Sequence, residues 1–237
     1  MNADFLGRRI IIKFKNINMT KIKACIFDLD GVIVDTAKFH YIAWKELADE
    51  MGFEFTVEDN ERLKGVSRMT SLDILLSIGK VNKSEDEKLA LATRKNENYL
   101  TYILKMGPEE ILPGTKAFLD TLKEEGVRIA LGSASKNAMT ILERLKLTNY
   151  FEAIIDGTKV SKAKPDPEVF LKAAEALGVQ PDNCVVFEDA EAGVEAALSG
   201  GMKCVGIGKA DVLGKAHLII DGLHQMNMQK LYALNEK

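Results

Sequence analysis

From residue 112 to the end of the chain, short apolar runs rich in β-branched residues alternate with helical segments. Gly126, Gly178 and Gly200 each close one of these segments shortly before the next apolar run. The pattern predicts helices over residues 115–125, 137–146, 167–177 and 190–198, and strands over residues 127–131, 153–155, 184–187, 203–207 and 216–220. Nearly continuous apolar strands separated by helices are typical of a parallel sheet that helices cover on both faces.

Residues 35–111 show a different pattern, which is helical and charged with few strand-like runs. Trp44, Leu47 and Met51 recur at helical spacing, and Gly52 ends that helix. A strand over residues 23–27 precedes this zone, whereas the other strands follow it. We therefore predict an α/β fold, in which residues 19–34 and 112–237 form a Rossmann-like, doubly wound parallel sheet and residues 35–111 form an inserted α-helical cap. Ligands of such sheets bind at the carboxyl ends of the strands, so the cap is expected to cover the site.

The composition excludes several classes of function. With 46% hydrophobic and 28% charged residues in a chain of 237, the protein can bury a large core. A formal net charge of −3 gives no basic footprint, so we do not expect nucleic acid as a partner. No apolar run approaches the roughly 20 residues that cross a bilayer, so we do not expect a membrane partner either.

The cysteines and the start of the chain indicate the cellular compartment of the protein. Cys25, Cys184 and Cys204 lie in or beside apolar runs, without the paired spacing of a disulfide framework or a zinc site. We interpret them as reduced, buried thiols of a cytoplasmic protein. Residues 1–18 lack the long apolar stretch and cleavage site of a signal peptide, and a strand-like run begins just after Met19. We expect translation to start at Met19 and residues 1–18 to be dispensable.

The strongest chemical signal is the segment from Phe27 to Gly31, where Asp28 and Asp30 follow a buried strand. Two carboxylates at this spacing are unfavourable at a strand end unless positive charge lies nearby, and a hard divalent cation with oxygen ligands meets that need. A carboxylate is also a competent nucleophile toward a phosphoryl group whose charge is neutralised. The alternative is a simple strand-end turn, in which aspartate is ordinary.

Three further segments follow predicted strands. Ser133 offers a hydroxyl beside backbone N–H groups suited to an anion, or it is a plain helix cap. Lys164, in a Lys-Pro-Asp-Pro loop, offers a cation, or it is a solvated lysine. Glu188 and Asp189 form a second candidate metal site, or they are an acidic pair at a helix start.

Together, these four segments resemble the haloacid dehalogenase superfamily of phosphohydrolases and phosphomutases, and the resemblance extends from Ile22 to about Leu223. It implies that Asp28 is the nucleophile and Asp30 the general acid and base. It also implies that Mg²⁺ is held by Asp28, the carbonyl of Asp30, Glu188 and Asp189, and that Ser133 and Lys164 bind the transferring phosphoryl oxygens.

In the cap, residues 35–40, residue 44, residues 63–68 and residues 94–96 look like those of one family in particular, and so do residues 132–137 in a core loop. That family is the β-phosphoglucomutases. By this resemblance, Arg68 would bind the phosphate that is not transferred. His40 would orient Asp30 or bind substrate, and Lys95 would reach the sugar or its phosphate. The other substrate-binding residues that the resemblance implies are Trp44, Gly65, Val66, Ser67, Ala134, Ser135, Lys136 and Asn137. Taken alone, His40 is equally a packed histidine, and Arg68 and Lys95 are solvated helix charges.

The resemblance implies an isomerase, a β-phosphoglucomutase that interconverts β-glucose 1-phosphate and glucose 6-phosphate through an aspartyl-phosphate and glucose 1,6-bisphosphate. We expect it to act as a monomer whose partners are the sugar phosphate and the sugar bisphosphate. A sugar-phosphate phosphatase of the same superfamily is the alternative, because the core segments are compatible with either water or a sugar hydroxyl as the acceptor of the phosphoryl group. A non-catalytic sugar-phosphate-binding regulator is disfavoured, since it needs neither Asp28 nor Asp30. The sequence does not identify the physiological sugar.

Overall fold

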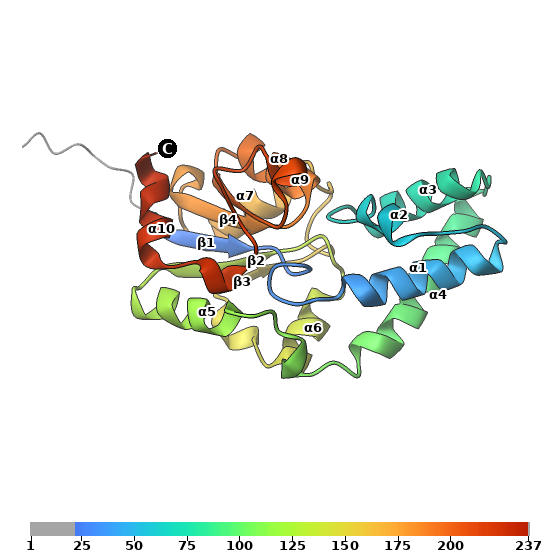
Figure 1. The fold of residues 1–237 in the computed structure, drawn as a ribbon, viewed down its shortest axis with the longest axis horizontal. Coiled ribbons are helices and arrows are strands. Elements are labelled where there is room, and N and C mark those ends of the chain that lie inside the picture. Colours follow the sequence, from blue (N-terminus) through green and yellow to red (C-terminus); the bar gives the residue numbers. More distant parts are fainter. Residues whose placement is uncertain (1–21, 237) are drawn as a thin grey trace, which may run out of the picture.

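A six-stranded parallel sheet forms the core of the protein in the computed structural model, which describes residues 22–236 (Figure 1). The strands lie in the order β3-β2-β1-β4-β5-β6. They are β1 (Ala24–Phe27), β2 (Arg128–Gly132), β3 (Ala153–Ile155), β4 (Cys184–Glu188), β5 (Lys203–Ile207) and β6 (Leu218–Ile220). The chain builds outward from β1 to β3 and then returns to place β4 on the other side of β1. This is the predicted doubly wound arrangement, and its crevice lies where the carboxyl ends of β1 and β4 meet.

Helices cover both faces of the sheet because the strand residues alternate in direction. In β1, Cys25 and Phe27 join one hydrophobic cluster, whereas Ala24 and Ile26 join another. The first cluster lies under α5 (Thr115–Glu124), α6 (Ala138–Leu145) and α10 (Met228–Ala233), and the second under α7 (Glu168–Ala176), α8 (Glu191–Ser199) and α9 (Ala210–Leu213) (Figure 1). The apolar strands predicted from the sequence are therefore buried from two sides.

The sequence-based predictions differ from the structure mainly at the ends of elements. Helices α5 to α8 and strands β1 to β5 begin and end within a residue or so of the predicted bounds. The last strand is shorter than predicted, with three residues instead of five. Helix α10 was not predicted, although its Leu231 and the following Leu234 are fully buried in the first cluster.

Four helices form the segment between β1 and α5. They are α1 (Ala37–Glu50), α2 (Val57–Glu61), α3 (Arg68–Gly79) and α4 (Glu85–Ile103). This segment has a hydrophobic cluster of its own around Trp44, Phe55 and Leu72, while Tyr99 and Ile103 of α4 join the main cluster of the core. The strands of the sheet point toward it (Figure 1). We refer to these helices as the cap; the predicted boundaries at residues 35 and 111 stay predictions.

The chain enters and leaves the cap through two neighbouring connections. Val34 and Ile111 form an antiparallel bridge, and the N–H of Asp35 donates to the carbonyl of Glu110 at 3.4 Å. The two connections are thus joined to each other where they cross from the core to the cap.

None of the helices within residues 22–236 is long and apolar enough to span a membrane. The expectation that residues 1–18 are a dispensable extension lies outside the described residues.

Candidate active site

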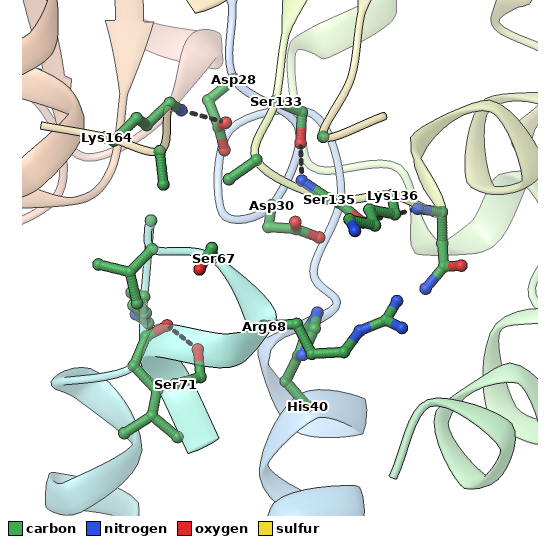
Figure 2. A pocket seen from close by; sticks show the side chains of 18 of the residues that line it. Asp28, Asp30, His40, Ser67, Arg68, Ser71, Ser133, Ser135, Lys136 and Lys164 are labelled. Carbon is green, nitrogen blue, oxygen red and sulfur yellow. Dashed lines mark hydrogen bonds and ion pairs between the residues drawn. The ribbon is translucent and has the colours of Figure 1, made fainter. Parts of the chain in front are cut away.

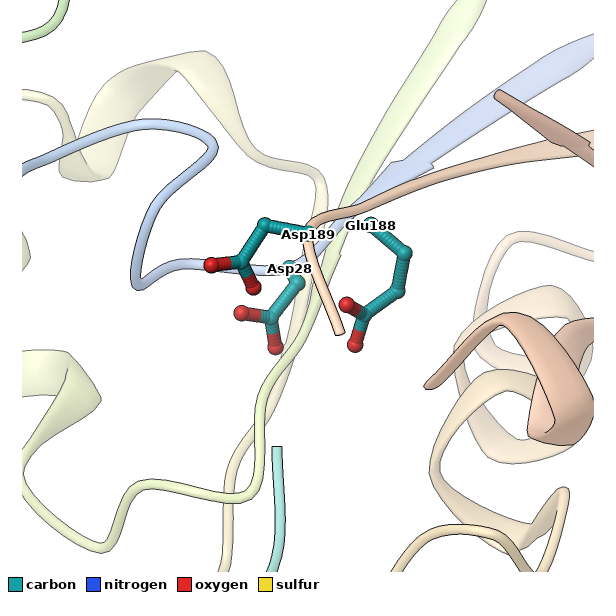
Figure 3. Close-up of side chains that lie close together, drawn as sticks. All are labelled: Asp28, Glu188 and Asp189. Atoms are coloured by element: carbon teal, nitrogen blue, oxygen red, sulfur yellow. The ribbon is translucent and has the colours of Figure 1, made fainter. Parts of the chain in front are cut away.

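Three carboxylates meet at the carboxyl ends of the two central strands. Asp28 directly follows β1, Glu188 is the last residue of β4 and Asp189 follows it. Because β1 and β4 pair in parallel with Phe27 opposite Phe187, Asp28 is placed beside Glu188. One oxygen from each of the three carboxylates lies within 4.8 Å of the others (Figure 3). The sheet register alone therefore creates a dense acidic cluster.

Lys164 lies within this cluster and joins two of its members. Its Nζ donates to Asp28 Oδ1 and to Glu188 Oε1, both at 2.6 Å. The second oxygen of Glu188 accepts the N–H of Ala190 at 2.8 Å. Lys164 and Glu188 are both buried, at 3% and 0% exposure. Lys164 is therefore not a solvated lysine, and Glu188 belongs to a buried strand end.

Burial dominates the electrostatics of the cluster. It raises the pKa of Asp28 to about 7, although the neighbouring Lys164 opposes the shift. Burial followed by repulsion from Glu188 also raises the pKa of Asp189 well above its usual value. For Lys164, burial lowers the pKa, but Asp28 and Glu188 together raise it above the ordinary value. Lys164 is thus a fixed cation among three crowded carboxyl groups.

The cluster fits a divalent cation. Lys164 pairs with two of the three clustered carboxylates, Asp28 and Glu188, so negative charge remains in excess when all three are ionised. Lys64 is a further cation near the cluster, with its Nζ 3.9 Å from Asp189 Oδ2. Carboxylate oxygens are the ligands that hard divalent cations prefer.

Asp30 lies on the turn between β1 and the cap. The hydroxyl of Thr36 donates to Asp30 Oδ1. Burial raises the pKa of Asp30, and this hydrogen bond opposes the rise. The turn needs Gly31, whose φ is +76° and whose Cβ, if present, would lie 2.1 Å from Asp189 Oδ2. The glycine thereby lets this turn pack against Asp189.

Ser133 lies directly after β2, on the same edge of the sheet. It is buried, and its Oγ accepts the N–H of Ser135 at 3.1 Å. Ser133 is not the cap of α6, because Asn137 precedes that helix. The side chain of Asn137 reaches the cap, where its Nδ2 donates to Asn96 Oδ1 at 2.9 Å. Figure 2 shows Ser133 near Asp28, with Asp30 between these core residues and the side chains of the cap.

Basic side chains of the cap form the opposite wall. Lys95 is only 3% exposed, its Nζ is 2.9 Å from His40 Nδ1, and it lies over the Trp44 ring at 4.4 Å from the centroid. Burial lowers the pKa of His40, and Lys95 and Arg68 lower it further. Burial followed by repulsion from Arg68 lowers the pKa of Lys95 to about 7. Lys95 is therefore not a solvated helix charge.

The loop before α3 brings the cap against the core. Ser67 caps α3, where its Oγ accepts the N–H of Thr70, and Arg68 is the first residue of the helix. Gly65 has a φ of +72°, and a Cβ there would lie 2.8 Å from the Cβ of Ala190 in the core. A side chain at position 65 would force the two parts of the molecule apart.

These residues line a cavity of about 330 Å³ between core and cap, which is in the range of small-molecule sites. Of the predicted site residues, all but Glu188 line it: Asp28, Asp30, His40, Trp44, Gly65, Val66, Ser67, Arg68, Lys95, Ser133, Ala134, Ser135, Lys136, Asn137, Lys164 and Asp189. Glu188 lies behind the wall, where it holds Lys164.

Sequence reasoning did not assign to the site seven further polar residues that line the cavity: Asn60, Lys64, Ser71, Asn96, Tyr99, Ser161 and Lys162. Tyr99 follows Lys95 by one helical turn, which was an available signal. No signal in the sequence indicated the contact of Lys64 with Asp189, because these residues belong to the cap and the core and lie far apart along the chain.

Comparisons with known proteins show the family to which the chain belongs. Residues 22–201 match the model of the haloacid dehalogenase-like hydrolase family. The chain is 44% identical to the β-phosphoglucomutase of Bacillus subtilis over 213 residues, which cover 89% of this chain and 94% of the relative. It is 31% identical to a phosphorylated carbohydrates phosphatase of Thermotoga maritima over 203 residues, covering 85% and 88%. The crystal structure of a β-phosphoglucomutase from Clostridium difficile superposes with a TM-score of 0.87 at 42% identity, covering 91% and 97%.

Proposed function

The chain belongs to the haloacid dehalogenase-like hydrolase family, and we propose that it is a phosphomutase that interconverts β-glucose 1-phosphate and glucose 6-phosphate. The predicted family, fold and similarity to β-phosphoglucomutases are confirmed. A phosphomutase of this kind is an isomerase, because the substrate and the product differ only in the position of one phosphate.

One observation carries the proposal: the cavity has cationic groups at both ends. Lys164 lies at the core end beside Asp28, and Arg68 lies at the cap end, with its guanidinium directed to the side where Ser135 and Lys136 lie (Figure 2). A mutase must hold a bisphosphate, so it needs a second phosphate site. Hydrolysis of a monophosphate needs only the first.

In the proposed reaction, a carboxylate oxygen of Asp28 attacks one phosphorus of the bound glucose 1,6-bisphosphate, and the bond from that phosphorus to the sugar oxygen breaks, which leaves a glucose monophosphate and the aspartyl-phosphate. Asp30 gives its proton to that oxygen as it leaves. In the reverse half-reaction, a hydroxyl of a bound glucose monophosphate gives its proton to Asp30 and attacks the phosphorus of the aspartyl-phosphate. This frees Asp28 and forms the bisphosphate. Lys164 and Ser133 contact the transferring oxygens, where Lys164 offsets their negative charge. Between the two half-reactions, the glucose 1,6-bisphosphate reorients in the cavity so that its other phosphate faces Asp28.

The bound metal is proposed to be Mg²⁺, held by Asp28, Glu188 and Asp189, with the carbonyl of Asp30 as a further ligand. When bound, such an ion would neutralise charge on the phosphoryl oxygens and help to orient them. Glu188 has a second task, because both of its oxygens already accept hydrogen bonds and one of them positions Lys164.

The remaining cavity residues are proposed to hold the sugar and its second phosphate. Arg68 binds the phosphate that is not transferred, and Ser135, Lys136 and Asn137 contact the same phosphate from the core side. The other contacts come from His40, Trp44, Gly65, Val66, Ser67, Lys95 and Ala134. The contact between Gly65 and Ala190 closes the cap onto the core, which excludes water that would otherwise hydrolyse the aspartyl-phosphate.

The decisive assay incubates the protein with β-glucose 1-phosphate, Mg²⁺ and a trace of glucose 1,6-bisphosphate. We expect glucose 6-phosphate to form in large excess over free phosphate. Release of free phosphate as the main product would support the phosphatase alternative, for which the similarity to the Thermotoga maritima phosphatase is the supporting observation. Binding without turnover would support a non-catalytic regulator.

Replacing Arg68 by alanine should lower mutase turnover far more than the hydrolysis of acetyl phosphate, which has no second phosphate. A charge-assisted contact with phosphate contributes about 1.5–3 kcal/mol, so the expected loss is roughly 10- to 150-fold. Arg68→Lys should recover only part of it, because lysine lacks the planar fork of donors. The two rates are measured by coupled glucose 6-phosphate and free-phosphate assays.

Arg62→Ala is the matched control, because Arg62 is an exposed arginine just before the same loop and pairs only loosely with Asp59. It should change neither rate. An equal loss on both substrates in Arg68→Ala would assign Arg68 to folding or cap closure instead of phosphate binding.

A further inference from the structure

Asn137 directs its side chain toward the cap instead of toward its own helix. It directly precedes α6, and an asparagine at that position commonly accepts a hydrogen bond from the first turn of the helix that follows. The side chain of Asn137 makes no such bond. Its Nδ2 donates instead to Asn96 Oδ1 at 2.9 Å. Helix α6 thus lacks this stabilising contact, which indicates another use for the amide group.

The hydrogen bond between Asn96 and Asn137 joins the two parts of the molecule at the cavity. Asn96 lies on α4, directly after Lys95, whereas Asn137 belongs to the core, and both asparagines line the cavity. Asn98, on the same helix, makes its hydrogen bond within the cap, where its Nδ2 donates to Glu46 Oε2 at 3.2 Å. The contact of Asn96 with Asn137 therefore exists only while the cap lies against the core.

The loop that carries Asn137 is held on the core side by two consecutive hydrogen bonds. The N–H of Ser135 donates to Ser133 Oγ at 3.1 Å, and the N–H of Asn137 donates to Ser135 Oγ at 3.2 Å. Ser133 in turn directly follows β2. The core therefore fixes the position of Asn137, and the hydrogen bond to Asn96 fixes the rotation of its amide group.

The amide group of Asn137 keeps one donor for a ligand. Its Nδ2 carries two N–H groups, and Asn96 accepts one of them. The other has no acceptor among residues 22–236, which the structure describes. Lys136 and Arg68 line the same cavity, and they are the cations proposed above for the phosphate that is not transferred. The second N–H of Asn137 is a neutral donor suited to an oxygen of that phosphate.

We propose that Asn96 is a positioning residue for Asn137: its amide oxygen holds one N–H of Asn137, so that the other N–H is turned to the phosphate that is not transferred. The inference rests on the proposed function, since a mutase needs this second phosphate site. Because Asn96 belongs to the cap, the donor is set in place only when the cap has closed on the core. Binding of the second phosphate and closure of the cap then favour each other.

The test compares Asn96→Ala with Asn98→Ala, which removes a hydrogen bond within the cap. In the proposed cycle, β-glucose 1-phosphate binds to the phosphorylated protein with its phosphate at the second site. We therefore expect its KM to rise roughly 3- to 10-fold in Asn96→Ala with kcat unchanged, because this phosphate is held equally before and during the transfer. Phosphorylation of Asp28 by acetyl phosphate, which has no second phosphate, should keep its wild-type rate. Asn98→Ala should leave all three values unchanged.

A double variant separates positioning from direct contact with the substrate. Asn137→Ala should raise the same KM at least as much as Asn96→Ala does, and Asn96→Ala should add no further rise in the Asn137→Ala background. The Tm of Asn96→Ala should be close to that of Asn98→Ala, because each variant loses one partly buried hydrogen bond. An unchanged KM in Asn96→Ala, an equal loss with acetyl phosphate or a full additional rise in the double variant would each overturn the proposal.

The proposal and the proposed function fail in different ways. If the wild type releases mainly free phosphate, the mutase assignment and the second phosphate site fail together, which the assay of the wild type alone shows. If the wild type forms glucose 6-phosphate and Asn96→Ala behaves like Asn98→Ala, only the role of Asn96 is wrong.

Discussion

Asp28→Asn should abolish turnover of the sugar phosphate and leave the fold intact. The change removes the proposed nucleophile, which is one of the three clustered carboxylates, while the shape of the side chain is kept. An amide does not attack the phosphoryl group, so no aspartyl-phosphate forms. The measurement is the formation of glucose 6-phosphate, together with labelling of the protein by radioactive acetyl phosphate.

The stability of Asp28→Asn should change little, because two effects oppose each other. Loss of a buried carboxyl whose pKa is raised to about 7 removes a group that is unfavourable when ionised at neutral pH. Lys164 loses one partner but keeps Glu188. Asp182→Asn is the control, because Asp182 is exposed far from the cavity lining; it should retain full activity. Substantial activity in Asp28→Asn, or labelling at another residue, would remove Asp28 from the nucleophile role.

Asp30→Asn should lower turnover of the sugar phosphate by about 10²–10⁴-fold, the usual contribution of general acid and base catalysis. The sugar oxygen is a poor leaving group and needs the proton of Asp30. Acetyl phosphate does not, so it should still phosphorylate Asp28 in this variant. The two rates measured on one protein sample therefore separate proton transfer from nucleophilic attack. Wild-type turnover in Asp30→Asn would require another acid and base.

The fold and the core of the site could be predicted because each depends on a short stretch of sequence. Buried strands read as continuous apolar runs, and glycines mark the helix ends. Asp28, Ser133 and Asp189 each directly follow a strand. Parallel strands end at the same edge of a sheet, so the residues that follow them were expected to lie close together there.

The cap side of the site was harder to predict, because it depends on contacts between distant segments. The sequence alone left Lys95 as a solvated charge, yet it is buried between His40 and Trp44. Only the similarity to a known family drew attention to it. Tyr99 was not singled out in the sequence, because its burial and the unpaired state of its hydroxyl become visible only in the folded structure. Helix α10 was missed because its sequence is short and polar on its exposed side.

The joined connections between core and cap have a consequence for the evolution of such proteins. Val34 bridges Ile111, and Asp35 lies within hydrogen-bond distance of Glu110. A genetic deletion or exchange of the residues between them therefore has only a small gap to close, and the order of the six strands stays the same. In the proposed mechanism, the nucleophile lies at the strand ends, whereas Arg68, the proposed second phosphate site, lies in the insertion. An exchange of the insertion would therefore alter the proposed substrate site and leave Asp28 in place.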